Sequence, residues 1–165
     1  MPIVAACAAA GWVMTEAEIR SIVARMDTAK ASEQEAAWEQ LRPLGETVAP
    51  FLAEAFPKMK KWQGRVALVF HSIKFARSSD AAFRLGVMAL QDRATRVRYR
   101  GCGLLAYSLK REALPHLQAL LRHEDPETVE DARAAMDAIA SRNHHYFIDR
   151  THSGHMFWEV TGATN

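Results

Sequence analysis

The residue types best suited to chemistry are concentrated near the end of the chain. Within twelve residues the sequence places four imidazoles and a carboxylate: His144, His145, Asp149, His152 and His155. Imidazole and carboxylate groups are good ligands for zinc and other transition metals. No HExxH or CxxC pattern accompanies them, however, and adjacent histidines in a strand would point to opposite faces. We therefore expect no cofactor, and His144, His152 and His155 are the candidate ligands if a metal binds.

The same segment can instead form a contact surface. Arg150 and Trp158 join the histidines and the aspartate as candidate contact residues, because arginine and aromatic side chains are favoured at interfaces. Residues 144–149 and 155–160 are aromatic and β-branched, and residues 150–154 have the composition of a turn. This pattern predicts a β-hairpin that caps the end of a helical region.

Nucleophilic catalysis has no matching motif in the sequence. No GxSxG, P-loop or dinucleotide-binding fingerprint occurs. Cys102 stands between Gly101 and Gly103 inside a predicted helix, and this setting favours a thiol packed in the interior over a nucleophile. His71 and His116 each occur singly on a predicted helix, where we interpret them as packing or surface residues. The sequence therefore predicts a non-enzymatic protein.

A second set of candidate residues lies in the middle of the chain and is strongly basic. The candidate partner-binding or anion-binding residues are Lys58, Lys60, Lys61, Trp62, Arg65, Arg93, Arg96, Arg98, Tyr99 and Arg100. Basic residues interleaved with an aromatic ring suit phosphate contact plus base stacking, and they suit an acidic protein surface equally well. The alternative is that they only solvate the helix starts, or that arginines brace one helix pair on the next.

The net charge of the chain conceals this cluster. The 21 basic and 19 acidic residues leave a formal charge of only +2. Residues 58–111 contain thirteen basic and two acidic residues, which gives this segment a charge of +11. The flanking segments are acidic: residues 1–57 contain four basic and eight acidic residues (−4), and residues 112–165 contain four basic and nine acidic residues (−5). Cations at helix starts oppose the helix dipole, so their placement there favours a binding role for some of them.

Helices are the predicted elements that position these residues. The chain of 165 residues is 49% hydrophobic and contains 29 alanines, which favours helix over strand. Residues 47–56 and 112–121 each carry a proline at the fourth position, in the first helical turn, and a similar stretch without proline covers residues 80–90. The predicted helices that follow begin near Val66, Val97 and Val129, about 32 residues apart. A fixed period of this length is typical of a stacked array of helix pairs.

The last predicted pair resembles a HEAT-type repeat. Residues 112–121 read EALPHLQALL and residues 125–136 read DPETVEDARAAM, which are similar to the ALPxLxxLL and DPxVRxxAxxAL patterns of that family. Glu130 stands where the family carries arginine, whereas Arg98 of the preceding pair matches. The resemblance to this HEAT-like (armadillo-type) family implies an α-solenoid scaffold that binds proteins, or sometimes nucleic acid, and it implies no reaction.

These observations predict an all-α fold: a short right-handed α-solenoid of about three HEAT-like helix pairs with a small C-terminal β-hairpin cap. The predicted boundaries are an apolar extension over residues 1–14, helical repeats over 15–143 and an aromatic, His-rich tail over 144–165. The extension lacks the basic residues of an export signal, so we expect a cytoplasmic protein. Met14 directly precedes a predicted helix start at Thr15 and is therefore a candidate for the true start of the chain. No apolar run approaches the ~18–20 residues of a membrane span, so no membrane partner is expected.

The predicted function is a non-enzymatic scaffold that binds a macromolecule on its basic central surface. An acidic protein surface is the expected partner, and a regulator, an adaptor or an immunity protein are the natural roles for a small protein resembling this family. The alternative is a nucleic-acid-binding HEAT-like protein, with or without DNA-repair activity, because some proteins of this kind act on alkylated DNA. A metal-dependent enzyme that uses the tail is a third hypothesis.

Overall fold

The computed structural model describes residues 5–7 and 12–155, and these are mostly helical. The α-helices are α1 (Glu16–Ala24), α2 (Ala31–Leu41), α3 (Ala49–Ala55), α4 (Trp62–Ser72), α5 (Asp80–Ala89), α6 (Thr95–Ser108), α7 (Leu114–Ala119) and α8 (Pro126–Ala140). Short 3-10 helices are η1 (Arg42–Val48), η2 (Phe56–Lys58), η3 (Ile73–Phe75), η4 (Arg111–Ala113), η5 (Leu120–Arg122) and η6 (His144–Phe147). Two three-residue strands, β1 (Ala5–Cys7) and β2 (Trp12–Met14), pair antiparallel before α1. The prediction of an all-α protein is confirmed for the described residues.

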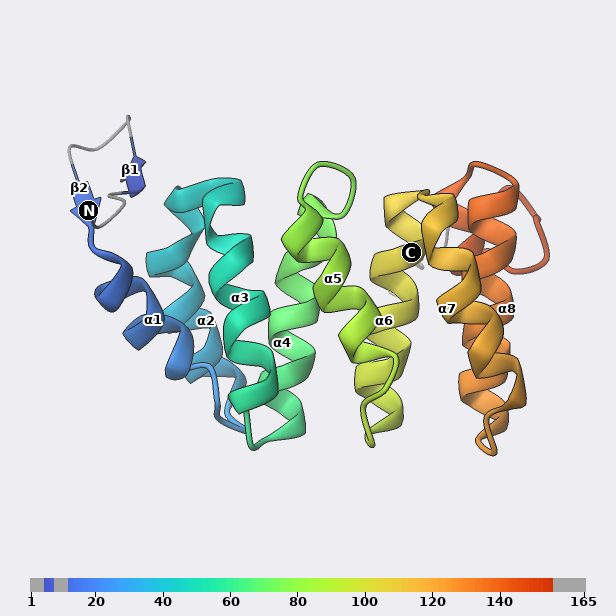
Figure 1. Ribbon diagram of the computed structural model, residues 1–165, viewed down its shortest axis with the longest axis horizontal. Helices are drawn as coiled ribbons and strands as arrows, with labels where there is room; N and C mark the ends of the chain where they lie inside the picture. Colours follow the sequence, from blue (N-terminus) through green and yellow to red (C-terminus); the bar gives the residue numbers. More distant parts are fainter. Residues whose placement is uncertain (1–4, 8–11, 156–165) are drawn as a thin grey trace, which may run out of the picture.

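The helices form an elongated array of two layers that runs from α1 at one end to α8 at the other (Figure 1). In one layer α3 packs against α1 and α5, and in the other α6 packs against α4 and α8. The layers are joined by contacts of α3 with α4, α5 with α6 and α7 with α8. None of the described helices is long and apolar enough to cross a membrane.

Local sequence signals explain where several helices begin. The Thr15 hydroxyl accepts a hydrogen bond from the Glu18 amide at 3.2 Å, and the Glu18 carboxylate accepts one from the Thr15 amide at 2.7 Å. This reciprocal capping box satisfies free amides at the start of α1. Pro50 and Pro115 lie in the first turns of α3 and α7, where a missing amide hydrogen costs no hydrogen bond. The proline register seen in the sequence therefore marks real helix starts.

The core lies between the two layers. Its largest fully buried side chains include Ile19, Leu41, Leu52, Leu68, Leu85, Leu104, Leu105, Leu117 and Ile139. Cys102 is also fully buried, and burial raises the pKa of its thiol to about 12. A thiol with that pKa stays protonated at neutral pH and is not a nucleophile. The interpretation of Cys102 as an interior packing residue is thus supported.

The prediction of a C-terminal β-hairpin is wrong in its first strand. Residues 144–147 form the 3-10 helix η6 instead, because the Asn143 side chain accepts a hydrogen bond from the His145 amide at 3.1 Å and caps this turn. η6 packs on α6 and α8, and this contact buries Phe147. The second predicted strand falls almost wholly on residues 156–160, which lie outside the described residues.

Close contact between α5 and α6 depends on glycine. A Cβ atom at Gly101 would lie 2.8 Å from the Cβ of Ala89 and 3.1 Å from the carbonyl oxygen of Gly86. Because these neighbours are helix backbone and a short side chain, neither can rotate away. A side chain at this position would therefore push the two helices apart.

We expect Gly101→Ala to lower the free energy of unfolding by about 1–2 kcal/mol, since overpacking outweighs the gain of about 1 kcal/mol in helix propensity. Gly103→Ala is the comparison, because the nearest atom to its new Cβ is at the edge of the Phe147 ring, 3.0 Å away. That ring can tilt, so a smaller loss is expected. Urea unfolding followed by circular dichroism measures both, and a stabilised Gly101→Ala variant would contradict the close approach.

Candidate functional site

Arg65, one of the predicted binding residues, lies in the interior. Its side chain is buried at the start of α4, with 7% of its surface exposed. The guanidinium donates to the two carboxylate oxygens of Asp92 from Nε at 2.6 Å and from Nη2 at 3.1 Å. Its Nη1 donates to the backbone oxygens of Met59 at 3.2 Å and Lys60 at 3.0 Å. Arg65 therefore ties the turn before α4 to the turn before α6.

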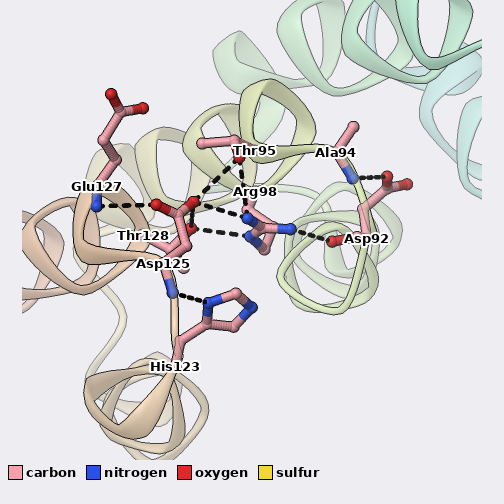
Figure 2. A network of polar contacts seen from close by, with 8 residues as sticks. All are labelled: Asp92, Ala94, Thr95, Arg98, His123, Asp125, Glu127 and Thr128. Carbon is pink, nitrogen blue, oxygen red and sulfur yellow. Dashed lines mark hydrogen bonds and ion pairs between the residues drawn. The ribbon is translucent and has the colours of Figure 1, made fainter.

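Arg98 repeats this arrangement one helix pair later (Figure 2). Its Nη1 donates to the backbone oxygen of Asp92 at 2.8 Å, and its Nη2 donates to the carboxylate of Asp125 at 2.8 Å. The Nε and Nη2 groups also donate to the hydroxyls of Thr128 and Thr95, at 2.8 and 3.0 Å. All the polar hydrogens of a planar guanidinium point in fixed directions, so such a set of partners fixes the geometry of the junction.

The two pairs share their spacing as well as their geometry. In each case the aspartate follows the arginine by 27 residues, and the carbonyl that accepts from Nη1 precedes it by six. These contacts favour the alternative that arginines brace one helix pair on the next, and they leave Arg65 and Arg98 unavailable to a partner. The repeated spacing of Arg65 with Asp92 and Arg98 with Asp125 was visible in the sequence as a signal of this role.

Asp125 is held as a carboxylate by its surroundings. Hydrogen bonds from the Thr128 hydroxyl first, and then from the Thr95 hydroxyl, Arg98 and the Glu127 amide, lower the pKa of this group to about 2 despite partial burial. The carboxylate is therefore ionised at neutral pH. It serves at once as the N-cap of α8 and as the counterion of a buried arginine.

The remaining basic candidates are exposed or half-buried, and we call them the basic strip: Lys58, Lys60, Lys61, Arg93, Arg96 and Arg100. Its lysines lie in and after η2, before α4, Arg93 lies in the turn before α6, and the other two arginines lie on α6. These turns run along one edge of the array, the lower edge in Figure 1. Within the described residues, only Lys58 of the strip has a carboxylate within 4.0 Å of its side-chain nitrogen, that of Glu54 at 3.4 Å. The Asp27 carboxylate accepts instead from the backbone amides of Lys60 and Lys61, at 3.1 and 2.8 Å.

Aromatic rings of α4 lie beneath the arginines of α6. The Arg96 guanidinium is 5.4 Å from the centre of the Trp62 ring, and Arg100 is 5.0 Å from that of Phe70 and 5.6 Å from that of Tyr99. These cation–π contacts hold the arginines against the face formed by α4 and α6. The structure thus brings the predicted residues Trp62, Arg96, Tyr99 and Arg100 together on one face.

A pocket of about 620 Å³ opens on the same face. Its lining is mainly apolar and aromatic and comes from α4, η3, α6 and the tail: Phe70, His71, Ile73, Lys74, Tyr99, Arg100, Gly103, Tyr107, His145, Phe147 and Ile148. The rings of Tyr99 and Phe147 lie 5.4 Å apart and form the wall between α6 and the tail. The tail is therefore part of the pocket and not merely a cover for the end of the array.

The positive charge of the pocket comes from two of its lining residues. Burial first, and then the nearby Lys74 and Arg42, lower the pKa of His71 to about 4, so this imidazole is neutral at pH 7. His71 stacks on Trp38 at 4.1 Å between ring centres, which fits an uncharged ring. The buried Nδ1 of His145 has no hydrogen-bond partner within the described part of the chain. Arg100 and Lys74 are left as the cations of the lining.

The histidines of the tail do not come together around a common point. His144 contacts Arg77 through its Nδ1 at 2.9 Å, whereas His152 contacts the Asp137 carboxylate through its Nε2 at 2.5 Å. Among residues 5–7 and 12–155 no group of three or more His, Cys, Asp or Glu side chains is placed to hold a metal ion. The candidate ligand set of His144, His152 and His155 therefore has no support in the described structure.

Two further tail candidates have structural partners. Asp149 is buried, and its carboxylate accepts hydrogen bonds from the Ser153 hydroxyl at 2.7 Å and the Ser153 and Gly154 amides at 2.9 Å. These bonds, led by the hydroxyl of Ser153, lower the pKa of Asp149. Arg150 pairs with Asp131 of α8 at 2.8 Å. Trp158 lies outside the described residues.

Sequence reasoning missed most of the pocket lining. Phe70, Lys74, Tyr107 and Ile148 were not candidates, although they form its walls together with Tyr99. One signal was available: Tyr99, Gly103 and Tyr107 recur every four residues and so share one face of α6. The contribution of the tail had no such signal, because it depends on how residues 144–148 fold against α6 and α8.

Comparison with known proteins gives no match, either to a family model or to a curated protein.

The bracing role of Arg98 predicts a large difference between two arginine substitutions. Arg98→Met leaves the Asp125 carboxylate without its buried counterion, and we expect the free energy of unfolding to fall by about 3 kcal/mol. Arg133→Met is the matched control, since Arg133 pairs with Glu130 on the exposed surface of α8, where such pairs contribute at most about 0.5 kcal/mol. Equal losses in urea unfolding would contradict the assignment.

Asp125 also predicts how stability depends on pH. Its pKa is lowered in the folded chain from an ordinary 3.8 to about 2, so its contribution to stability is complete above about pH 4 and is lost as the pH falls through that interval. We expect the urea midpoint of unfolding to decrease between about pH 4 and pH 2, and to decrease less in Asp125→Asn. Glu130→Gln, which changes an exposed carboxylate of the same helix, should keep the full decrease.

Proposed function

We propose that the chain is a short right-handed α-solenoid of about three HEAT-like helix pairs, and that it acts as a non-enzymatic scaffold binding an acidic protein surface. The two-layer arrangement of α3 to α8 supports the repeat architecture. So do the two Arg–Asp pairs, since Arg65 and Arg98 and their partners Asp92 and Asp125 stand at the same interval in the sequence. A regulator, an adaptor or an immunity protein would each use such a scaffold.

The observation that carries this proposal is the clustering of cations without carboxylate partners along the basic strip. The buried arginines of the same region are paired with aspartates. Some exposed basic residues elsewhere have a carboxylate partner, as Arg133 does in Glu130, and Arg84, which has none among the described residues, has no basic neighbour in the sequence between residues 78 and 92. The side-chain nitrogens of Lys60, Lys61 and the strip arginines have no carboxylate within 4.0 Å in the described structure. Their fields add along one edge and one face, and a partner that supplies carboxylates would be attracted there.

The basic strip is flanked by acidic segments at both ends of the array, which limits how far along the array the positive surface extends. Residues 1–57 and 112–165 carry charges of −4 and −5. On α8, next to Arg96 and Tyr99, the surface displays Glu127 and Glu130. These carboxylates would repel a phosphate backbone that continued from α6 across α8. A compact acidic patch on a protein fits the α4 and α6 face without meeting them.

Nucleic-acid binding, with or without repair activity, is the second candidate. It is favoured by Trp62, which is 37% exposed and whose ring lies beside Arg96, as in a stacking platform for bases. A nucleic-acid complex would be recognised by affinity for single-stranded or duplex DNA that falls steeply with salt.

Fluorescence anisotropy with a labelled polyglutamate peptide and labelled DNA tests the proposal. We expect the peptide to bind at low salt, and the double reversal Arg93→Glu/Arg96→Glu to weaken binding about tenfold or more, because each reversal replaces an attraction with a repulsion. Arg84→Glu/Arg111→Glu is the charge-matched control, since these exposed arginines lie on α5 and on η4, which follows the C-terminal end of α6, whereas the strip lies at its N-terminal end.

Equal weakening by the control pair would show that only net charge matters and would contradict the proposal. Tighter binding of DNA than of polyglutamate at the same salt concentration would favour the second candidate. The two protein variants unfold at similar urea concentrations if both sets of side chains are on the surface, and this measurement accompanies the binding data.

A further inference from the structure

We propose that the pocket between α4, α6 and the tail receives one large apolar or aromatic side chain of an acidic peptide segment, while the basic strip holds the carboxylates that flank it. The inference rests on the proposed function and adds the chemistry of the segment that is bound. It joins two features that lie on one face and share Arg100: the pocket and the strip.

The size and lining of the pocket suit a single anchoring side chain. A volume of about 620 Å³ falls in the range of ligand sites and accommodates a large side chain with part of its backbone. Phe70 and Ile148 at its walls are 50% and 53% exposed, an unfavourable state for large apolar groups. An apolar side chain inserted between them would remove this surface from water, and central aromatic anchors of this kind dominate binding energy at many interfaces.

The charges that line the pocket indicate that the peptide residues next to the anchor are acidic. The lining of the pocket includes neutral aromatic rings, among them His71, and the cations Arg100 and Lys74. Arg100 is already held over the rings of Phe70 and Tyr99, so a cationic side chain could not take the same aromatic faces without repulsion. Carboxylates next to the anchor would instead complete the charge-assisted hydrogen bonds that Arg100 lacks in the described structure.

The same features favour a peptide over a nucleobase. Sequence-specific recognition of a base requires hydrogen-bond groups directed at its edge, but the lining is largely hydrocarbon and ring surface. Beyond Tyr99 the surface turns acidic at Glu127 and Glu130, where a neighbouring phosphate would be repelled. A short peptide needs to contact only the pocket and the strip, and it can end before α8.

Selection from a random short-peptide library displayed on phage, with the immobilised full chain as target, tests the inference. We expect the enriched peptides to be rich in Asp and Glu and to share one Phe, Trp, Leu or Met. A synthetic version of the most enriched peptide is then measured by anisotropy beside a version in which that residue is Ala.

The pocket is tested by Phe70→Ala, with Met88→Ala as the matched control. Both side chains are partly exposed and apolar, but Met88 lies on α5 in the other layer. We expect Phe70→Ala to weaken binding of the selected peptide about tenfold, and Met88→Ala to leave it unchanged. For the peptide whose anchor is Ala, Phe70→Ala should have almost no further effect, because the contact that it removes is already missing. Thermal unfolding confirms that both variants are folded.

The outcomes separate this inference from the proposed function. If the enriched peptides are acidic but share no anchor, or if Phe70→Ala has as little effect as Met88→Ala, the pocket assignment is wrong and the acidic partner stands. If the enriched peptides are not acidic, both proposals are wrong. If labelled single-stranded DNA binds more tightly than the selected peptide and Phe70→Ala weakens it, the pocket serves a nucleobase and the inference is overturned.

Discussion

The buried pairing of an arginine with an aspartate in the following turn fixes how successive helix pairs are stacked. Each guanidinium joins three segments: its own helix, the carbonyl of the preceding turn, and the carboxylate of the next. Because an unpaired buried charge is strongly destabilising, neighbouring helix pairs are held in the one relative position that keeps each arginine paired with its aspartate. That position sets α4 beside α6 and α6 beside α8. The aromatic rings, the strip arginines and the pocket are all positioned by it.

One helix uses the same residue type for two purposes. Along α6 the arginines at 96, 98 and 100 alternate, and a step of two residues turns a helix by roughly 200°. Arg98 therefore points to the interior when Arg96 and Arg100 point to the surface. The periodicity of the helix thus separates the buried structural arginine from the two arginines for which we propose a binding role.

Much of the fold followed from sequence, and the tail did not. The prolines at 50 and 115 and the capping box at Thr15 report on local backbone geometry, which is why they located helix starts correctly. The aromatic composition of residues 144–149 suggested a strand. In the structure residues 144–147 form a 3-10 helix, because this turn places Phe147 in the contact with α6 and α8. Among the site residues, alternation of Arg96, Arg98 and Arg100 was readable in advance. The pocket was not, since its walls come from segments that only tertiary packing brings together.

The wall contributed by His145, Phe147 and Ile148 has a consequence for the timing of synthesis. The helix pairs that carry the strip precede this segment in the chain, so a ribosome exposes the positive face before the pocket exists. Until translation has passed Ile148 and η6 has docked on α6 and α8, a nascent chain presents the basic residues but lacks one wall of the pocket. Under the proposed binding mode, attraction by charge would therefore precede selection of the anchoring side chain.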